Sequence, residues 1–150
     1  MEIVLRLVSR QRKERTEGLE LALANDSSYV NGAQIGVING AVKSRGAQAG
    51  GVNYASGSRG AQIGVINSAV KSRGAQTGVV NYASELSYGA QIGLCNYAIK
   101  LRGLQVGLVN ITGQDSKGVQ IGLLNIITDS PWYTCLIPIA VRTGKRKINL

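Results

Sequence analysis

The sequence has no histidine and no phenylalanine, and its 150 residues include only 2 Cys, 2 Pro and 1 Trp. The absence of histidine removes the commonest general base and the commonest metal ligand. The cysteines, Cys95 and Cys135, are too few for a disulfide framework and lack the paired spacing of a zinc site. Any apolar core must therefore be assembled from Val, Ile, Leu and Ala.

Acidic residues are also scarce. The chain has 8 Asp and Glu against 17 Lys and Arg, a formal net charge of +9, and none of the acidic residues falls between Gly32 and Ser84. No pair of carboxylates recurs, so hydrolysis by two carboxylates has no basis in the sequence. We therefore expect no catalytic residues, no metal site and no cofactor, whereas the positive charge favours a polyanionic partner.

Long apolar runs are missing as well. Gly, Gln and Asn interrupt every apolar stretch before it reaches 18 residues, so we expect no transmembrane helix. At the N-terminus, Arg6 interrupts the apolar run and no small-residue cleavage site follows. This segment is a poor match to a signal peptide.

What the sequence does contain is a repeat of 14 or 15 residues. Units such as GAQIGVINGAVKSR begin at glycines 18, 32, 46, 60, 74, 89, 103 and 118. Self-similarity at a fixed short period is typical of a solenoid or another repeat array. We divide the chain into a basic N-terminal cap or arm (1–17), an eight-repeat β domain (18–130), and a C-terminal cap with a basic tail (131–150).

The units predict β-strands rather than helices, because all but the first carry at least two glycines, every unit carries an asparagine, and the apolar residues are largely β-branched. Positions are numbered here from the first glycine of each unit. In the first unit Leu19, Leu21 and Leu23 alternate with Glu20 and two alanines, which predicts that positions 2, 4 and 6 face the core. Each unit should be a strand of eight to ten residues followed by a polar turn, and the two extra residues should fall in or near turns.

Two topologies fit this pattern. In a β-solenoid each unit is one coil and equal positions stack in register, whereas in an antiparallel eight-stranded meander or barrel each unit is one strand. We favour the solenoid because identical amides stacked in register can hydrogen-bond along the stack. The recurring amides occupy position 3 (Gln34, Gln48, Gln62, Gln76, Gln91, Gln105 and Gln120) and position 8 (Asn25, Asn39, Asn53, Asn67, Asn81, Asn96, Asn110 and Asn125).

Position 7 is always apolar, although strict alternation points it away from the core. Either the chain turns a corner there, or the domain carries a second apolar stripe that serves as a subunit interface. In the barrel alternative the stripe would face lipid, the one case in which we expect a membrane partner. Cys95 should behave as a small buried hydrophobe. The stripe comprises Ile38, Val52, Ile66, Val80, Cys95, Val109 and Leu124.

Basic residues recur just before the next glycine and two residues earlier. In a solenoid they form a basic edge, which predicts binding of an anionic polymer, a glycan or lipid headgroups with strong salt dependence. A solvated edge that keeps the protein soluble is the alternative. Aromatic residues are sparse there, so we expect no specific nucleic-acid recognition. The basic edge comprises Lys43, Arg45, Arg59, Lys71, Arg73, Lys100, Arg102 and Lys117.

The two ends differ from the repeats. Alternation over Met1 to Val8 predicts a strand, and the following RQRKERTE predicts a solvated turn or arm. After Asn125 the pattern dissolves, and Pro131 and Pro138 argue against a central strand. Terminal repeats are usually atypical, so we expect the aromatic and apolar residues Trp132, Tyr133, Leu136 and Ile137 to cap the stack.

The tandem unit Gly-x-Gln-Ile-Gly-Leu-x-Asn, over about residues 18–140, resembles the repeats of bacterial surface-repeat proteins. In those proteins the array is likewise followed by a short segment with Trp or Pro. The resemblance implies a protein of the cell surface or envelope with no assigned chemistry. We expect a non-enzymatic structural or adhesive scaffold that self-associates. The alternatives are an outer-membrane-type β-barrel and a soluble module that binds anionic polymers through the basic edge.

Overall fold

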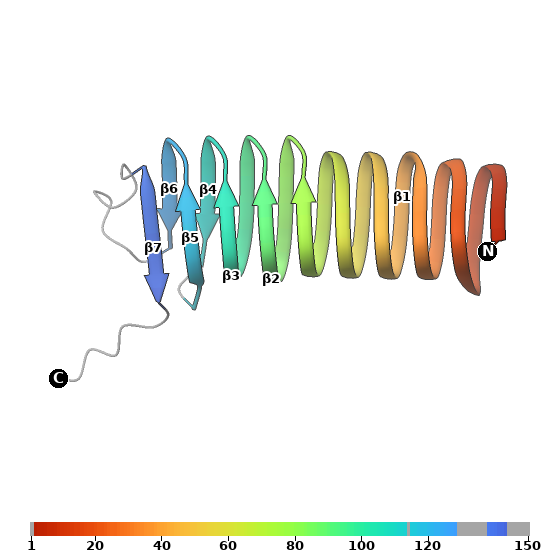
Figure 1. The fold of residues 1–150 in the computed structure, drawn as a ribbon, viewed down its shortest axis with the longest axis horizontal. Helices are drawn as coiled ribbons and strands as arrows, with labels where there is room; N and C mark the ends of the chain where they lie inside the picture. The colour runs from red at the N-terminus through yellow and green to blue at the C-terminus, as the bar shows by residue number, and fades with distance from the viewer. Residues whose placement is uncertain (1, 114, 129–137, 144–150) are drawn as a thin grey trace.

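The computed structural model describes residues 2–113, 115–128 and 138–143, which form strands and short connections without any helix. The chain winds as successive coils stacked along one long axis (Figure 1). The strands are β1 (Glu2–Thr77), β2 (Val80–Ile92), β3 (Cys95–Val106), β4 (Val109–Thr112), β5 (Lys117–Ile121), β6 (Leu124–Ile127) and β7 (Ile139–Thr143).

Each coil pairs in parallel with the next coil, one repeat further along the chain. In the β1–β2 pair Asn67 lies opposite Asn81 and Gly74 opposite Gly89, and the same register continues from β2 through β6. Stacking of equal positions in parallel register defines a β-solenoid, as predicted. The antiparallel meander or barrel is wrong, because its consecutive units would pair antiparallel.

The strands are longer than the sequence indicates. β1 alone spans 76 residues, because parallel pairing continues through the segments predicted to be polar turns. These segments are corners of the coil. The extra residue of the unit starting at Gly74 falls between Ala83 and Leu86, where the register shifts, so a turn does absorb it. Residues 10–17 also belong to β1, so the prediction of an arm there is wrong.

The interior of the solenoid is polar. In the unit that starts at Gly60, Ile63 is 54% exposed and Val65 is 55% exposed. Across the repeats position 2 is half-buried, and positions 4 and 6 mostly point to solvent. The prediction that positions 2, 4 and 6 form the core is therefore wrong. The buried residues of this unit, each at most 2% exposed, are Gln62, Asn67, Ala69 and Ser72 at positions 3, 8, 10 and 13.

Two ladders of amide side chains run through this interior. In the glutamine ladder each Nε2 donates to the Oε1 of the preceding glutamine, as from Gln62 to Gln48 at 2.8 Å. In the asparagine ladder each Nδ2 donates to the Oδ1 of the following asparagine, as from Asn67 to Asn81 at 2.9 Å. Most of these amides also donate to a backbone carbonyl, so the buried polar groups are satisfied on successive coils.

The two ladders have opposite polarity. Donors of the glutamine ladder point toward the N-terminal end, where the row ends on the buried carboxylate of Glu20, which accepts from Gln34 at 2.9 Å and from Ser27. Donors of the asparagine ladder point toward the C-terminal end, where Asn125 donates to the Gly122 carbonyl. A carboxylate suits the acceptor end of a ladder because it needs only to accept.

The glycine at position 5 makes room for the asparagine ladder. A Cβ built on Gly64 would lie 2.2 Å from the Gly50 carbonyl oxygen and 2.6 Å from the Asn53 Nδ2. Neither distance is possible for a real side chain. The Gly-x-x-Asn spacing of the repeat is therefore a packing rule, in which asparagine occupies the space that glycine leaves on the next coil.

The glycine at position 1 serves a corner. Gly60 has a φ of +125°, and a Cβ there would lie 2.0 Å from the carbonyl oxygen of Gly46. The six other unit-starting glycines from Gly18 to Gly103 also have positive φ. Both the backbone conformation and the close approach of neighbouring coils exclude larger residues at this corner.

At the C-terminal end β7 pairs antiparallel with β5, so that Ile139 lies opposite Ile121 and Ala140 opposite Gln120. β7 lies beside the last coils of the stack (Figure 1). Ala140 is buried, which places it over the end of the glutamine ladder. The predicted cap residues Trp132, Tyr133, Leu136 and Ile137 lie outside the described residues.

Candidate functional site

The structure separates the three residue sets singled out in the sequence. The recurring glutamines and asparagines are buried and bonded to one another, so they hold the coils together and offer nothing to a ligand. The position-7 stripe and the basic edge both lie on the surface. They are the two candidate sites.

The position-7 stripe points outward at a corner of the coil. Its members range from half-buried to 53% exposed at Ile38. Cys95 is exposed with a free thiol, so the prediction that it is buried is wrong. Both positions 6 and 7 face solvent, which means that the chain turns the corner between them.

The sequence reading missed that positions 4 and 6 extend this stripe into a broad surface. We call positions 4, 6 and 7 together the apolar face. From Ile35 to Leu124 these positions carry only apolar residues and glycine, apart from Thr77 and Cys95, and no charge. Recurrence of Ile, Val and Leu at these positions was visible in the sequence. Hydrophobicity alone does not distinguish the two faces of a strand, so this recurrence predicts the interior as readily as an apolar surface.

The apolar face contains a shallow groove. Its walls are the position-4 and position-6 columns, including Ile92 and Leu94, and its floor contains the glycines of position 5. The groove runs across successive coils and ends at Pro138 and Ile139. Ile139 and Val141, at 57% and 67% exposure, continue the apolar surface onto β7.

The basic edge lies at a different corner. Position 14 carries Arg45, Arg59 and Arg73 on β1, followed in register by Tyr88 on β2, Arg102 on β3 and Lys117 on β5. Position 12 carries Lys43, Gly57, Lys71, Leu86 and Lys100. All of the cations predicted for this edge are exposed, and the coil pairing aligns them along the solenoid axis.

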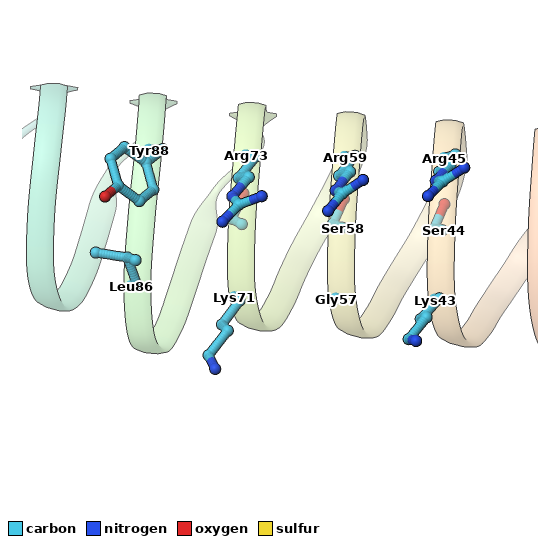
Figure 2. A pocket seen from close by; sticks show the side chains of 11 residues that line it. Lys43, Ser44, Arg45, Gly57, Ser58, Arg59, Lys71, Arg73, Leu86 and Tyr88 are labelled. Atoms are coloured by element: carbon cyan, nitrogen blue, oxygen red, sulfur yellow. The ribbon is translucent and has the colours of Figure 1, made fainter.

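Part of the basic edge is hollowed. Arginine and lysine columns line a groove whose floor includes the serines of position 13, with Leu86 and Tyr88 at one end (Figure 2). Figure 2 shows the arginines in one row and Lys43, Gly57 and Lys71 in a second row. We call this the basic groove. The serines were not singled out in the sequence, although their recurrence between two basic columns was a visible signal.

Two of the lysines are partly neutralised, whereas the arginines are not. Lys71 pairs with Glu85 at 3.1 Å, and Lys100 lies 3.9 Å from Asp115. Among the described residues, no carboxylate comes within ion-pair distance of Arg45, Arg59 or Arg73. The groove therefore keeps most of its positive charge.

Aromatic rings lie at both ends of the arginine row. The Tyr88 ring has the guanidinium of Arg73 at 5.7 Å and that of Arg102 at 5.4 Å. At the other end the Arg45 guanidinium lies 5.6 Å from the Tyr29 ring. These cation–π contacts hold the outer arginines toward the rings and leave Arg59 between them.

The described residues hold no group of three or more His, Cys, Asp or Glu that could bind a metal ion. Nor does this part of the chain include a helix long and apolar enough to cross a membrane. No protein-family model, curated protein or solved structure matches the sequence or the fold of this chain.

Proposed function

We propose that this protein is a non-enzymatic structural scaffold that self-associates through its apolar face. The observation that carries the proposal is the uncharged surface formed by positions 4, 6 and 7, which repeats on seven successive units from Gly32 onward. Centres of protein interfaces are depleted of charge in the same way. The resemblance to bacterial surface-repeat proteins supplies the proposed setting, the cell surface or envelope.

The extent of the face supports a protein partner. Sixteen exposed Ile, Val and Leu residues lie on its three columns and on β7. At about half exposure they present on the order of 1,000 Å² of apolar surface, beyond the roughly 300–600 Å² of the largest patch on a typical monomer. A standard interface buries about 800 Å² on each partner, so the face is large enough for one.

The shape of the face favours a second copy of the same chain. Its position-4 and position-6 columns form two ridges along the solenoid axis with a groove between them, and the side chains of each ridge recur about every 4.8 Å from coil to coil. A second copy carries ridges whose side chains recur at the same spacing. Under two-fold symmetry the position-4 ridge of each copy can enter the groove of the other, so that one surface complements itself. An unrelated partner would need a matching repeat.

Sedimentation velocity on the purified protein tests this proposal. The wild-type chain should form dimers or larger species, and the double substitution I63D/V65D should be monomeric, because two carboxylates would be desolvated in the contact. The matched control, S56D/S68D, places the same charges at positions 11 and 9 and should associate like the wild type. A monomeric wild type at high micromolar concentration would overturn the proposal.

Salt provides a second measurement. The chain carries a net charge of +9, so two copies repel each other, and added salt screens that repulsion while leaving an apolar contact intact. Association should therefore strengthen between low and moderate ionic strength. Association that weakened with salt would point to contacts between charges and would contradict an uncharged interface.

A further inference from the structure

The basic groove concentrates positive charge in a way that the fold does not need. Arg45, Arg59 and Arg73 stand on consecutive coils (Figure 2), and the sequence offers no acidic residue between Asp26 and Glu85 to balance them. Like charges directly opposite each other on paired strands are destabilising. The fold keeps three such charges in one row.

The groove offers a bound anion two kinds of donor on the coils of Arg45 and Arg73. A guanidinium from position 14 stands on one side, and an ammonium from position 12 stands on the other side at Lys43 and Lys71 (Figure 2). Guanidinium groups bind the oxygens of phosphate or sulfate in a bidentate fork, and ammonium groups act as point charges. These donors repeat about every 4.8 Å along the axis.

We propose that the basic groove binds a linear polyanion whose phosphate or sulfate groups follow the solenoid axis, contacting the arginines of successive coils. The groove is open opposite Arg59, where position 12 is Gly57. A Cβ at Gly57 would meet no atom within 4 Å. A chain of anions can therefore enter at this point and extend along the row in both directions.

The aromatic residues at the ends of the groove do not favour a nucleic acid. Proteins that bind single strands without sequence preference stack bases on free aromatic faces. Tyr88 has arginine guanidinium groups close to its ring on two sides, and Tyr29 has those of Arg15 and Arg45. The basic groove thus offers charge without a free stacking platform. The proposed polyanion is therefore bound through its phosphate or sulfate groups alone.

Titration with three probes tests the proposal: inorganic polyphosphate, dextran sulfate and single-stranded oligothymidylate. Substituting R45Q/R59Q/R73Q should weaken binding of the first two by about tenfold or more and should lower the salt slope by about two to three. The matched control, K145Q/R146Q/K147Q, removes three charges outside the described residues and should keep most of the affinity. Preference for polyphosphate or for dextran sulfate then identifies the anion.

Gly57 allows a gain-of-function test. Substituting G57K places a cation in the open space opposite Arg59 and should raise the affinity for polyphosphate, with a salt slope steeper by about 0.7–0.9. Substituting G57E at the same position should lower the affinity. Since this glycine has free space around it and ordinary φ, both variants should fold, which their melting temperatures can check.

Three outcomes would overturn the proposal. One is equal affinity of R45Q/R59Q/R73Q and K145Q/R146Q/K147Q, which would mean that net charge alone attracts the polymer. Another is identical binding by G57K and G57E. The third is oligothymidylate binding tighter than either other probe with the same dependence on the arginines, which would assign the groove to nucleic acid. The monomeric I63D/V65D variant should bind polyphosphate normally, so this test does not depend on self-association.

Discussion

The interior and the apolar face of this solenoid reverse the usual distribution of side chains. Gln62 is completely buried, whereas its neighbour Ile63 is 54% exposed. The difference teaches that hydrophobicity does not decide which side chains lie inside this fold. At positions 3 and 8 the side chains lie inside because amides repeat the same hydrogen bond on every coil, with one donor and one acceptor per rung.

The narrowness of the coil explains why the amides suffice. Position 10 is mostly alanine and position 13 mostly serine, so small side chains fill the rest of the interior. The glutamine amide also crosses the interior of its own coil, as from Gln62 Nε2 to the Ser68 carbonyl at 3.4 Å. Larger apolar side chains enter this interior at a few places, such as Val30 and Leu101 at position 13.

The largest loss of stability should come from a methyl group added at position 5, where glycine makes room for the asparagine ladder. Substituting Gly64→Ala places a Cβ against the carbonyl of the preceding coil, where it cannot be accommodated without separating the coils. We expect a loss of more than about 4 kcal/mol in the free energy of unfolding, measured by urea denaturation.

Gly57→Ala is the matched control for this substitution, because its Cβ meets open space. It should leave the free energy of unfolding unchanged or raise it by up to about 1 kcal/mol. Equal stability of the two alanine variants would show that the coils do not approach each other as closely as described.

A smaller loss should follow from making the interior apolar. Substituting Gln62→Leu removes one rung and leaves the Oε1 of Gln48 and the Nε2 of Gln76 without their ladder partners. Each unsatisfied buried group costs about 1–3 kcal/mol, so the total should be about 2–5 kcal/mol. If the leucine variant melted above the wild type, the ladder would not be what holds the interior together.

Substitution at Glu20, the acceptor end of the glutamine ladder, should lower the free energy of unfolding less than substitution of Gln62 does. Substituting Glu20→Leu removes the acceptor used by Gln34 and Ser27, but Gln34 Nε2 keeps its bond to the Gly40 carbonyl, so the cost should be that of about one unsatisfied group, about 1–3 kcal/mol. Glu20→Gln keeps a side-chain acceptor and should cost less. Hydrogen exchange should report faster opening of the first coils in the leucine variant, with little change near Gln105. Uniformly faster exchange would mean that the ladder end does not act locally.

The smallest effect should come from making the apolar face polar. Substituting Ile63→Gln changes the free energy of unfolding by no more than about 0.5 kcal/mol, because the side chain is already half in water. The same substitution should weaken self-association in sedimentation velocity. A large loss of monomer stability would show that the face belongs to the folding core.

The sequence was enough to predict the solenoid, its repeat length and its in-register amides, because those features follow from recurrence alone. It was not enough to predict which side faces inward. Leu19, Leu21 and Leu23 alternate cleanly, yet Leu23 is 59% exposed and Glu20 is fully buried. Applying the rule that apolar residues lie inside therefore predicts the wrong set of alternate positions as inward-facing. The amides at positions 3 and 8 indicated the correct inward-facing positions, since a ladder of amides hydrogen-bonds strongly only where water is excluded.

The candidate sites were predictable to different degrees. Alignment of the basic residues at one corner follows directly from the period, so the basic edge could be predicted with its members. The groove within it could not, because it depends on Gly57 and on the buried serines of position 13. Extension of the position-7 stripe to positions 4 and 6 could not be predicted, because those positions were expected to face the core.

The opposite polarity of the two amide ladders has a consequence for how the number of repeats can change in evolution. Within the described residues, one ladder amide oxygen lacks a partner at each end, Asn25 Oδ1 and Gln120 Oε1, and the rungs between them repeat the same amide–amide hydrogen bond. Recombination between repeats that adds or deletes one 14-residue unit would therefore leave both ends chemically unchanged. The length of the solenoid can then vary with the number of repeats in the gene, while insertion of a single residue is tolerated only at a turn.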